Sequence, residues 1–199
     1  MVVTKSRNDT TVTLRGPETQ ASSAFAPSDT EFFGIVFKAG AFMPKFPVNT
    51  LMDRRDLNLP AASGKSFWLN SSAWQLPDFE NADTFISRLV RDDLLVFDPM
   101  IDVALREQPH TLTRRTIQRR FLQATGLTHS AFYQIQRARY ATMLLKQGMT
   151  ILDAVESVGY SDQAHMTRAL KHLMGRTPAQ IVNRNMAVPM SFLFKTLPF

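Results

Sequence analysis

The chain has 199 residues, of which 44% are hydrophobic and 20% are charged, a balance typical of a folded globular protein. It contains no cysteine, which excludes disulfides, thiol nucleophiles and thiolate zinc sites. The formal net charge is +6, so a polyanionic partner is expected.

The positive charge is concentrated in one segment. Residues 1–110 hold 11 Lys and Arg against 14 Asp and Glu, whereas residues 111–184 hold 11 against 3. The first segment therefore has a net charge of −3 and the second a net charge of +8. This asymmetry indicates that the polyanion binds the C-terminal half.

Several classes of protein are disfavoured. The N-terminus lacks the apolar core of a signal peptide, and no stretch approaches the roughly 18 apolar residues of a transmembrane helix. We therefore expect a cytoplasmic protein with no membrane partner. The histidines lack the spacing of metal ligands, and no phosphate-binding Gly–Lys loop or nucleophile elbow is present. The sequence predicts no metal site, no cofactor and no enzyme activity.

The N-terminal region is predicted to combine strands and helices. Residues 11–14 and 31–42 are rich in β-branched and aromatic side chains, which is typical of strands. Residues 44–75 carry repeated Pro and Gly breakers and are predicted to be irregular. Residues 81–95 have the apolar stripe of an amphipathic helix, and residues 98–106 predict another short helix.

From residue 111 onward the pattern is helical. We expect helices at 113–126, 128–147, 150–158, 162–173 and 178–184. Thr113 and Asp162 have the short polar side chains that cap helix N-termini. A glycine lies at the end of the first segment or shortly after the end of each of the next three, and glycine is a typical helix-ending residue.

Two of these segments repeat one pattern at an offset of 49 residues. The sequences TRRTIQRRFLQATGLT (113–128) and DQAHMTRALKHLMGRT (162–177) both contain a cap, an apolar residue, an arginine, a large apolar residue and a glycine. The offset pairs Arg119 with Arg168 and Phe121 with Leu170. A repeat with matching caps and ends indicates one structural unit used twice.

The segment between the copies has a length that suits DNA. Residues 129–147 would form a helix of roughly 28 Å at about 1.5 Å per residue. Successive major-groove segments on one face of DNA lie about 34 Å apart. Residues 150–158, the turn at 159–161 and residues 162–173 also follow the order of a helix-turn-helix. An ordinary helical hairpin has the same order, but the charge and the repeat favour DNA binding.

These segments resemble the C-terminal DNA-binding domain of the AraC/XylS family of bacterial regulators. The resemblance covers about residues 113–182 and includes RRTIQRRFLQATGLT, Arg137, Ala141 and GYSDQAHMTRALKHLMGRTPAQI. It implies two helix-turn-helix units joined by a long linker helix, with both units inserted into adjacent major-groove segments. Residues 34–46 and 66–91 also resemble the end of the companion domain in one branch of the family.

The resemblance implies which side chains face the groove. They are Arg115, Gln118 and Arg119 in the first recognition helix, and Gln163, Ala164, Thr167 and Arg168 in the second. The chemistry agrees for most of them, because Arg can bond bidentately to guanine, Gln to adenine, and Thr to several base edges. Arg114 and Arg120 are expected phosphate contacts, with the helix N-terminus at Thr113. For His165 we expect a structural hydrogen bond instead of base reading.

The predicted fold is mainly α, with a C-terminal all-α double helix-turn-helix domain preceded by a small α+β domain. Residues 1–97 form the shortened α+β domain, a candidate effector or dimerisation region. Residues 98–185 form the double helix-turn-helix, although only residues 106–112 separate a short helix from the first recognition helix, where the family usually has a complete scaffold helix. Residues 186–199 form an apolar tail that either packs on the body or contacts a second copy.

The predicted function is that of a sequence-specific transcriptional regulator with double-stranded DNA as its partner. A homodimer is the candidate assembly, and no effector is assigned. A DNA-repair alkyltransferase is set aside because its chemistry needs an acceptor thiolate, which this chain lacks. The alternative is a truncated interaction module that pairs with other regulators without strong DNA binding of its own.

Overall fold

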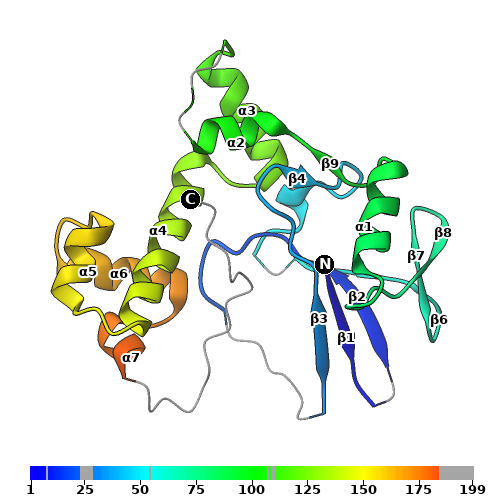
Figure 1. Ribbon diagram of the computed structural model, residues 1–199, viewed down its shortest axis with the longest axis horizontal. Helices are drawn as coiled ribbons and strands as arrows, with labels where there is room; N and C mark the ends of the chain where they lie inside the picture. Colours follow the sequence, from blue (N-terminus) through cyan, green and yellow to red (C-terminus); the bar gives the residue numbers. More distant parts are fainter. Residues whose placement is uncertain (8, 23–28, 54, 107, 109–110, 184–199) are drawn as a thin grey trace. The chain divides into compact units, whose positions relative to one another are not determined.

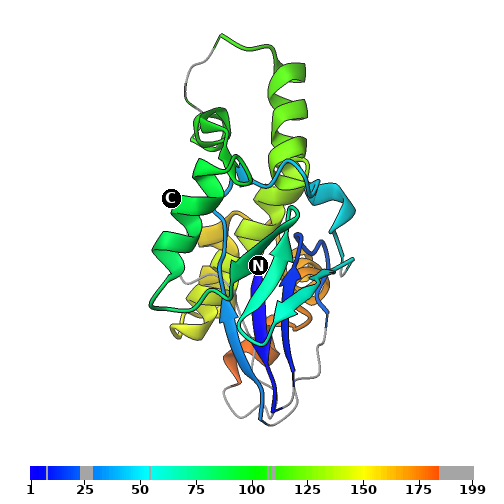
Figure 2. The ribbon, with the colours of Figure 1, turned by 90° about the vertical axis from the view of Figure 1, so that its right-hand side faces the viewer.

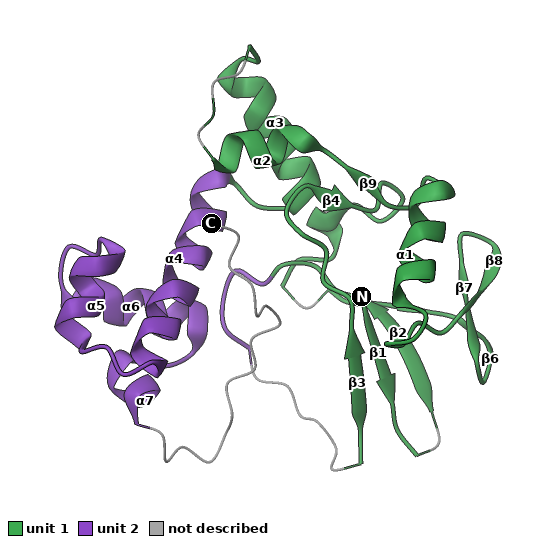
Figure 3. Ribbon diagram, viewed as in Figure 1, with its two compact units in different colours: residues 1–17, 24–128 green, residues 18–23, 129–199 purple. Residues whose placement is uncertain are grey.

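The computed structural model describes residues 1–7, 9–22, 29–53, 55–106, 108 and 111–183. The chain divides into two compact units, shown in different colours in Figure 3. Unit 1 comprises residues 1–17 and 24–128, and unit 2 comprises residues 18–23 and 129–199. The boundary after residue 128 falls inside the segment 98–185, for which the sequence predicts a single domain. The predicted apolar tail, 186–199, lies outside the described residues.

Unit 1 begins with a four-stranded antiparallel sheet (Figure 1). Its strands, in the order β3-β1-β2-β5, are β3 (Glu31–Gly34), β1 (Val2–Lys5), β2 (Thr10–Leu14) and β5 (Leu57–Leu59). Val3, Val12 and Leu14 are buried, because alternate side chains of a strand point to the same face of its sheet. The strand predicted at 11–14 is confirmed, and β3 with β4 (Ala41–Phe42) confirms the strand and turn predicted within 31–42.

The prediction that residues 44–75 are irregular is wrong. Besides β5, they contain a short 3-10 helix, η1 (Val48–Thr50). They also contain an antiparallel meander of three strands (Figure 2), namely β6 (Ala61–Ser63), β7 (Ser66–Leu69) and β8 (Ser72–Gln75). The turn from β7 to β8 has positive φ at both Asn70 and Ser71, as in a tight hairpin. Strands this short, separated by breakers, show too little alternation to be recognised from sequence.

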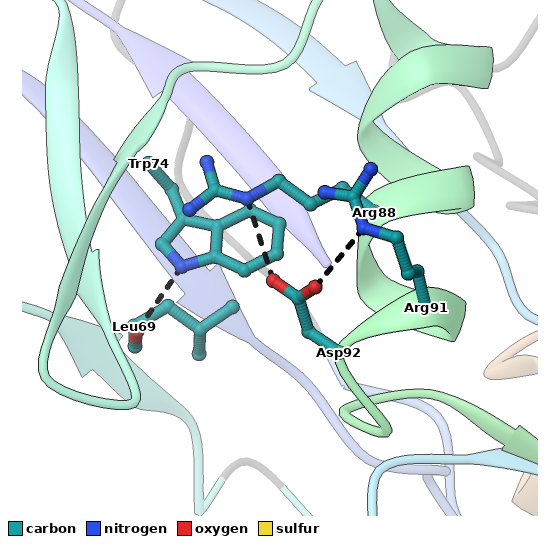
Figure 4. Close-up of polar contacts among 5 residues, drawn as sticks. All are labelled: Leu69, Trp74, Arg88, Arg91 and Asp92. Atoms are coloured by element: carbon teal, nitrogen blue, oxygen red, sulfur yellow. Dashed lines mark hydrogen bonds and ion pairs between the residues drawn. The ribbon is translucent and has the colours of Figure 1, made fainter.

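The helix α1 (Ala82–Arg91) confirms the predicted amphipathic helix and packs with the buried side chains of the meander. Its Phe85 ring meets the buried Trp74 ring edge-on, at 5.6 Å between centroids. Figure 4 shows the indole Nε1 of Trp74 donating to the Leu69 carbonyl at 3.1 Å. The Arg88 guanidinium lies 3.8 Å from the indole centroid and pairs with Asp92, so this cation is used inside unit 1.

Two helices complete unit 1, namely α2 (Pro99–Leu105) and α3 (Arg114–Thr125). Asp98 caps α2 by accepting a hydrogen bond from the backbone N–H of Met100 at 3.0 Å. The strand β9 (Val96–Phe97) leads into α2 and pairs with β4. Gly40 has a φ of +92°, and a Cβ there would lie 2.9 Å from the Asp98 carbonyl oxygen. Glycine therefore allows the chain before β4 to pass against the start of α2.

Unit 2 is helical and contains α4 (His129–Lys146), α5 (Ile151–Val158), α6 (Gln163–Met174) and α7 (Pro178–Val182). Its core joins Ala138 and Ala141 of α4 to Ala154 of α5 and to Met166 and Leu170 of α6. Each of these side chains is fully buried, and the three alanines allow the helices to approach closely.

Residues 18–23 belong to unit 2, where the Ala21 N–H donates to the His172 carbonyl of α6 at 2.8 Å. The helices predicted from residue 111 onward are confirmed by α3 to α7 in the part of the chain that is described. None of the helices in that part has both the length and the apolarity needed to cross a bilayer.

Candidate nucleic-acid interface

The helix α3 carries the first predicted set of DNA contacts. Thr113 begins it, because the Thr113 hydroxyl accepts from the Thr116 backbone N–H at 3.3 Å. Gly126 ends it in the left-handed region, with a φ of 71°. Phe121 and Ala124 are buried in unit 1 and anchor one face of α3. The other face is therefore available to a ligand.

Arg115, Gln118 and Arg119 form an exposed stripe on that available face. They are spaced i, i+3, i+4, which places side chains on one side of a helix. Leu122, at i+7, extends the stripe and is 47% exposed. The structure thus brings the first predicted group of base contacts together. None of their three side chains is hydrogen-bonded or ion-paired to another described residue.

Arg120 lies outside this stripe. Its Nε and Nη2 donate to Asp98 Oδ2 and Oδ1, each at 2.7 Å. The hydrogen bond with Asp98 raises the pKa of Arg120 above its ordinary value. Because Asp98 also caps α2, the pair connects the start of α2 to the middle of α3. The sequence predicts that Arg120 contacts a phosphate. In the structure its charge is instead neutralised by Asp98 within unit 1.

The helix α6 carries the second set. Its Met166 and Leu170 are buried, while Ala164 and Arg168 are exposed and Thr167 is partly exposed. These three positions have the same spacing as the stripe of α3, shifted by the 49-residue offset. Gln163 is also exposed, in the first turn.

The sequence-based prediction missed Lys171, which extends the α6 stripe at i+7 and is exposed. Lys171 Nζ donates to the Gly175 carbonyl at 3.3 Å, near the end of the helix. The repeat could have identified the position, because the offset pairs Lys171 with Leu122. The first copy has the apolar Leu122 at this position, so comparing the two copies does not indicate a basic residue there.

The turn before α6 is held by Arg137 of α4. The guanidinium carbon of Arg137 lies 4.2 Å from the centroid of the Tyr160 ring, and Nη1 donates to the Gly159 carbonyl at 3.4 Å. Tyr160 is 5% exposed; burial raises its pKa above the ordinary value, and the charge of Arg137 opposes this rise. Gly159 has a φ of 73°, which favours glycine. Arg137 therefore fixes the turn from which α6 begins.

His165 makes the structural hydrogen bond that the sequence predicts. Its Nδ1 lies 3.0 Å from the Ser161 hydroxyl, and its ring meets Tyr160 edge-on at 5.2 Å between centroids. The backbone N–H of His165 donates to the Asp162 carboxylate at 2.6 Å, which caps α6. The first turn of α6 is thus tied to the turn that precedes it. No cluster of three potential metal ligands occurs among the residues that the structure describes.

We expect the substitution Asp162→Asn to change the pH dependence of stability while leaving stability near neutral pH almost unchanged. The hydrogen bond from the His165 backbone holds the pKa of Asp162 below its ordinary value of 3.8. Such a carboxyl contributes stability above the unfolded pKa, and this contribution is lost as pH falls through the folded pKa. Asn caps a helix about as well but does not titrate. Acid should therefore destabilise the parent more than the variant.

The measurement is a series of thermal melts, followed by circular dichroism, from about pH 7 to about pH 2. Identical pH dependence in both proteins would show that the Asp162 cap contributes no pH-dependent stability. Asp153→Asn is the matched control, because it makes the same substitution in the first turn of another helix of the same unit, α5.

Comparison with known proteins identifies the helical segment. Residues 111–184 match a protein-family model described as "Helix-turn-helix domain". A protein of Corynebacterium diphtheriae named HTH-type transcriptional regulator RipA is 33% identical over 88 residues, which is 44% of this chain and 25% of that protein. The RipA of Corynebacterium glutamicum is 32% identical over 88 residues, which is 43% of this chain and 27% of that protein. The match thus spans about a quarter of these relatives. No solved structure is significantly similar to the chain.

Proposed function

We propose that this protein is a sequence-specific DNA-binding transcriptional regulator whose AraC-type DNA-binding domain lies in residues 111–184, the segment that matches the helix-turn-helix family model. The observation that carries the proposal is the repeated stripe. In α3 and again in α6, the side chains opposite the buried anchors are those whose chemistry reads base edges. The transcriptional regulators named above support the same function.

In this proposal α3 and α6 enter adjacent major-groove segments, and α4 is the linker between them. Arg115, Arg119 and Arg168 bond to guanine, and Gln118 bonds to adenine. Thr167 contacts a base edge, as does Gln163 from the first turn, and the Ala164 methyl group suits the thymine methyl.

Phosphate contacts come from Arg114 and from the N-terminus of α3 at Thr113. Arg114 is exposed and makes no ion pair with a described carboxylate. Lys171 adds a cation at the far end of the α6 stripe. We assign Arg120 to the internal pair with Asp98 instead, because Nε and Nη2, on one edge of its guanidinium, already donate to both carboxylate oxygens. The free energy of breaking that pair would have to be recovered from the phosphate.

Selection of bound fragments from random duplex DNA by the purified full chain tests the proposal. We expect an enriched site with two parts whose centres lie about 10 base pairs apart, one helical turn of DNA. Affinity for that site should fall by orders of magnitude between about 50 mM and about 200 mM salt, because several phosphates release counterions.

Absence of any enriched sequence would overturn the proposal. Binding to another regulator with a flat salt dependence, and no enriched DNA, would instead favour the interaction module. Titrations at several salt concentrations distinguish these results, because a dry protein interface releases few ions.

A further inference from the structure

We propose that residues 44–50 form a second DNA-contacting element beside α3, in which the Asn49 amide donates to a backbone phosphate. The inference rests on the proposed DNA binding by α3. It concerns the segment between β4 and β5, which lies outside the residues that match the helix-turn-helix family.

The segment is fixed against α3 within unit 1. A Cβ placed on Gly126, at the end of α3, would lie 3.0 Å from Val48 Cγ1, so η1 packs closely on this end of the helix. The buried Met43 anchors the start of the segment in the core. The Thr50 hydroxyl donates to the Pro47 carbonyl at 2.7 Å and closes the turn of η1. The segment therefore holds a set position relative to the α3 stripe.

The two elements share a pocket of about 380 Å³. Arg119, Leu122 and Gln123 line it from α3, and Asn49 lines it from η1. The rest of the lining is apolar and comes from residues 42–44 and 47. A ligand that reaches Arg119 at this rim therefore also approaches Asn49.

The width of the major groove determines which part of DNA Asn49 would meet. The groove is about 12 Å wide, and a helix with its side chains is about 10–12 Å across, so α3 alone would fill it. An element packed beside α3 must then lie over one of the phosphate ridges that border the groove. Arg119 makes no ion pair with another described residue, so its positive charge also favours an anion at this rim.

The side chain of Asn49 suits a phosphate contact. It is exposed and makes no hydrogen bond to another described residue, so its amide is available as a donor. Side-chain amides are among the groups that bond phosphate oxygens in protein–DNA complexes. Pro44 and Pro47 restrict the backbone that precedes Asn49, which lowers the entropy lost when the segment binds.

A charge series at Asn49 tests the inference on the selected DNA. Asn49→Lys should strengthen binding several-fold at low salt and steepen the slope of log affinity against log salt by about 0.9, the value for one added phosphate contact. Asn49→Asp should weaken binding about tenfold because its charge repels the phosphate. Asn49→Ala should weaken binding roughly 2–10-fold, as expected for one lost hydrogen bond, with the slope unchanged because no charge is removed.

Gln75 provides the matched control. It is exposed on β8 of the same unit and does not line the pocket. Gln75→Lys and Gln75→Asp make the same changes in net charge, and we expect neither to alter affinity measurably. Equal effects at Gln75 and Asn49 would show that net charge alone is responsible and would overturn the inference. An unchanged salt slope in Asn49→Lys would overturn it as well.

The remaining outcomes separate this inference from the proposed function. If the parent selects no DNA sequence, the proposed function fails. If the parent selects a site but none of the Asn49 substitutions changes the DNA affinity, only the inference fails. Sedimentation that shows self-association altered by Asn49→Asp, with DNA affinity unchanged, would assign the surface to a second copy and also overturn it.

Discussion

Replacing Phe121 with alanine should lower the free energy of unfolding of unit 1 by about 3–5 kcal/mol. The side chain is fully buried and anchors α3, so its removal takes apolar surface from the core and leaves a cavity. Unfolding by urea can be followed by tryptophan fluorescence, because Trp68 and Trp74 both lie in unit 1.

The neighbouring Leu122 is the matched control for Phe121. Leu122 is 47% exposed on the predicted DNA-facing stripe, so Leu122→Ala should change stability by no more than about 0.5 kcal/mol. Comparable losses in the two variants would mean that the assignment of the buried and exposed faces of α3 is incorrect. The two substitutions thus test the orientation on which the proposed function depends.

We expect Arg168→Ala to reduce discrimination at a single base position by about 1–3 kcal/mol, as for the loss of one bidentate contact to guanine. Its side chain is exposed on the α6 stripe, opposite the buried Met166 and Leu170. Affinities for the selected site and for its single-base variants, at one fixed salt concentration, give this value. Equal losses on all sequences would indicate that Arg168 binds phosphate.

Two arginines of α3 provide the comparison for Arg168. Arg114→Ala should weaken binding to all sequences alike and reduce the salt slope by about 1, because a phosphate contact positions the protein without reading bases. Arg120→Ala should instead lower stability and leave the slope unchanged, because Arg120 pairs with Asp98. A reduced slope in Arg120→Ala would return this residue to the phosphate contacts.

Local features of the helices were predictable because their causes are local. Thr113 and Asp162 cap their helices through the hydrogen bonds of the next turn, and Gly126 and Gly175 end them with positive φ. A cap and its partner lie only three residues apart, so the pattern is visible in a short stretch of sequence. The repeat also predicted which faces of α3 and α6 are buried and which are exposed, because these positions recur at the same offset.

The N-terminal strands were harder to predict. β6, β7 and β8 have three or four residues each, and residues such as Pro60 and Gly64 lie between or before them. Their stability comes from pairing with one another and from packing Phe67 and Trp74 against α1, which lies later in the chain. These contacts involve residues that the local pattern does not connect, so propensity alone favoured an irregular segment.

By itself, the amino-acid sequence determined that this protein has a basic C-terminal half with two copies of a capped helix carrying Arg119 and Arg168. Charge, caps and helical period are properties of nearby residues, so they can be read without a fold. Only the tertiary structure decided that Arg120, the next residue after Arg119, pairs with Asp98, and that η1 packs beside α3. These contacts join residues far apart in the chain, and their distances exist only after the chain has packed.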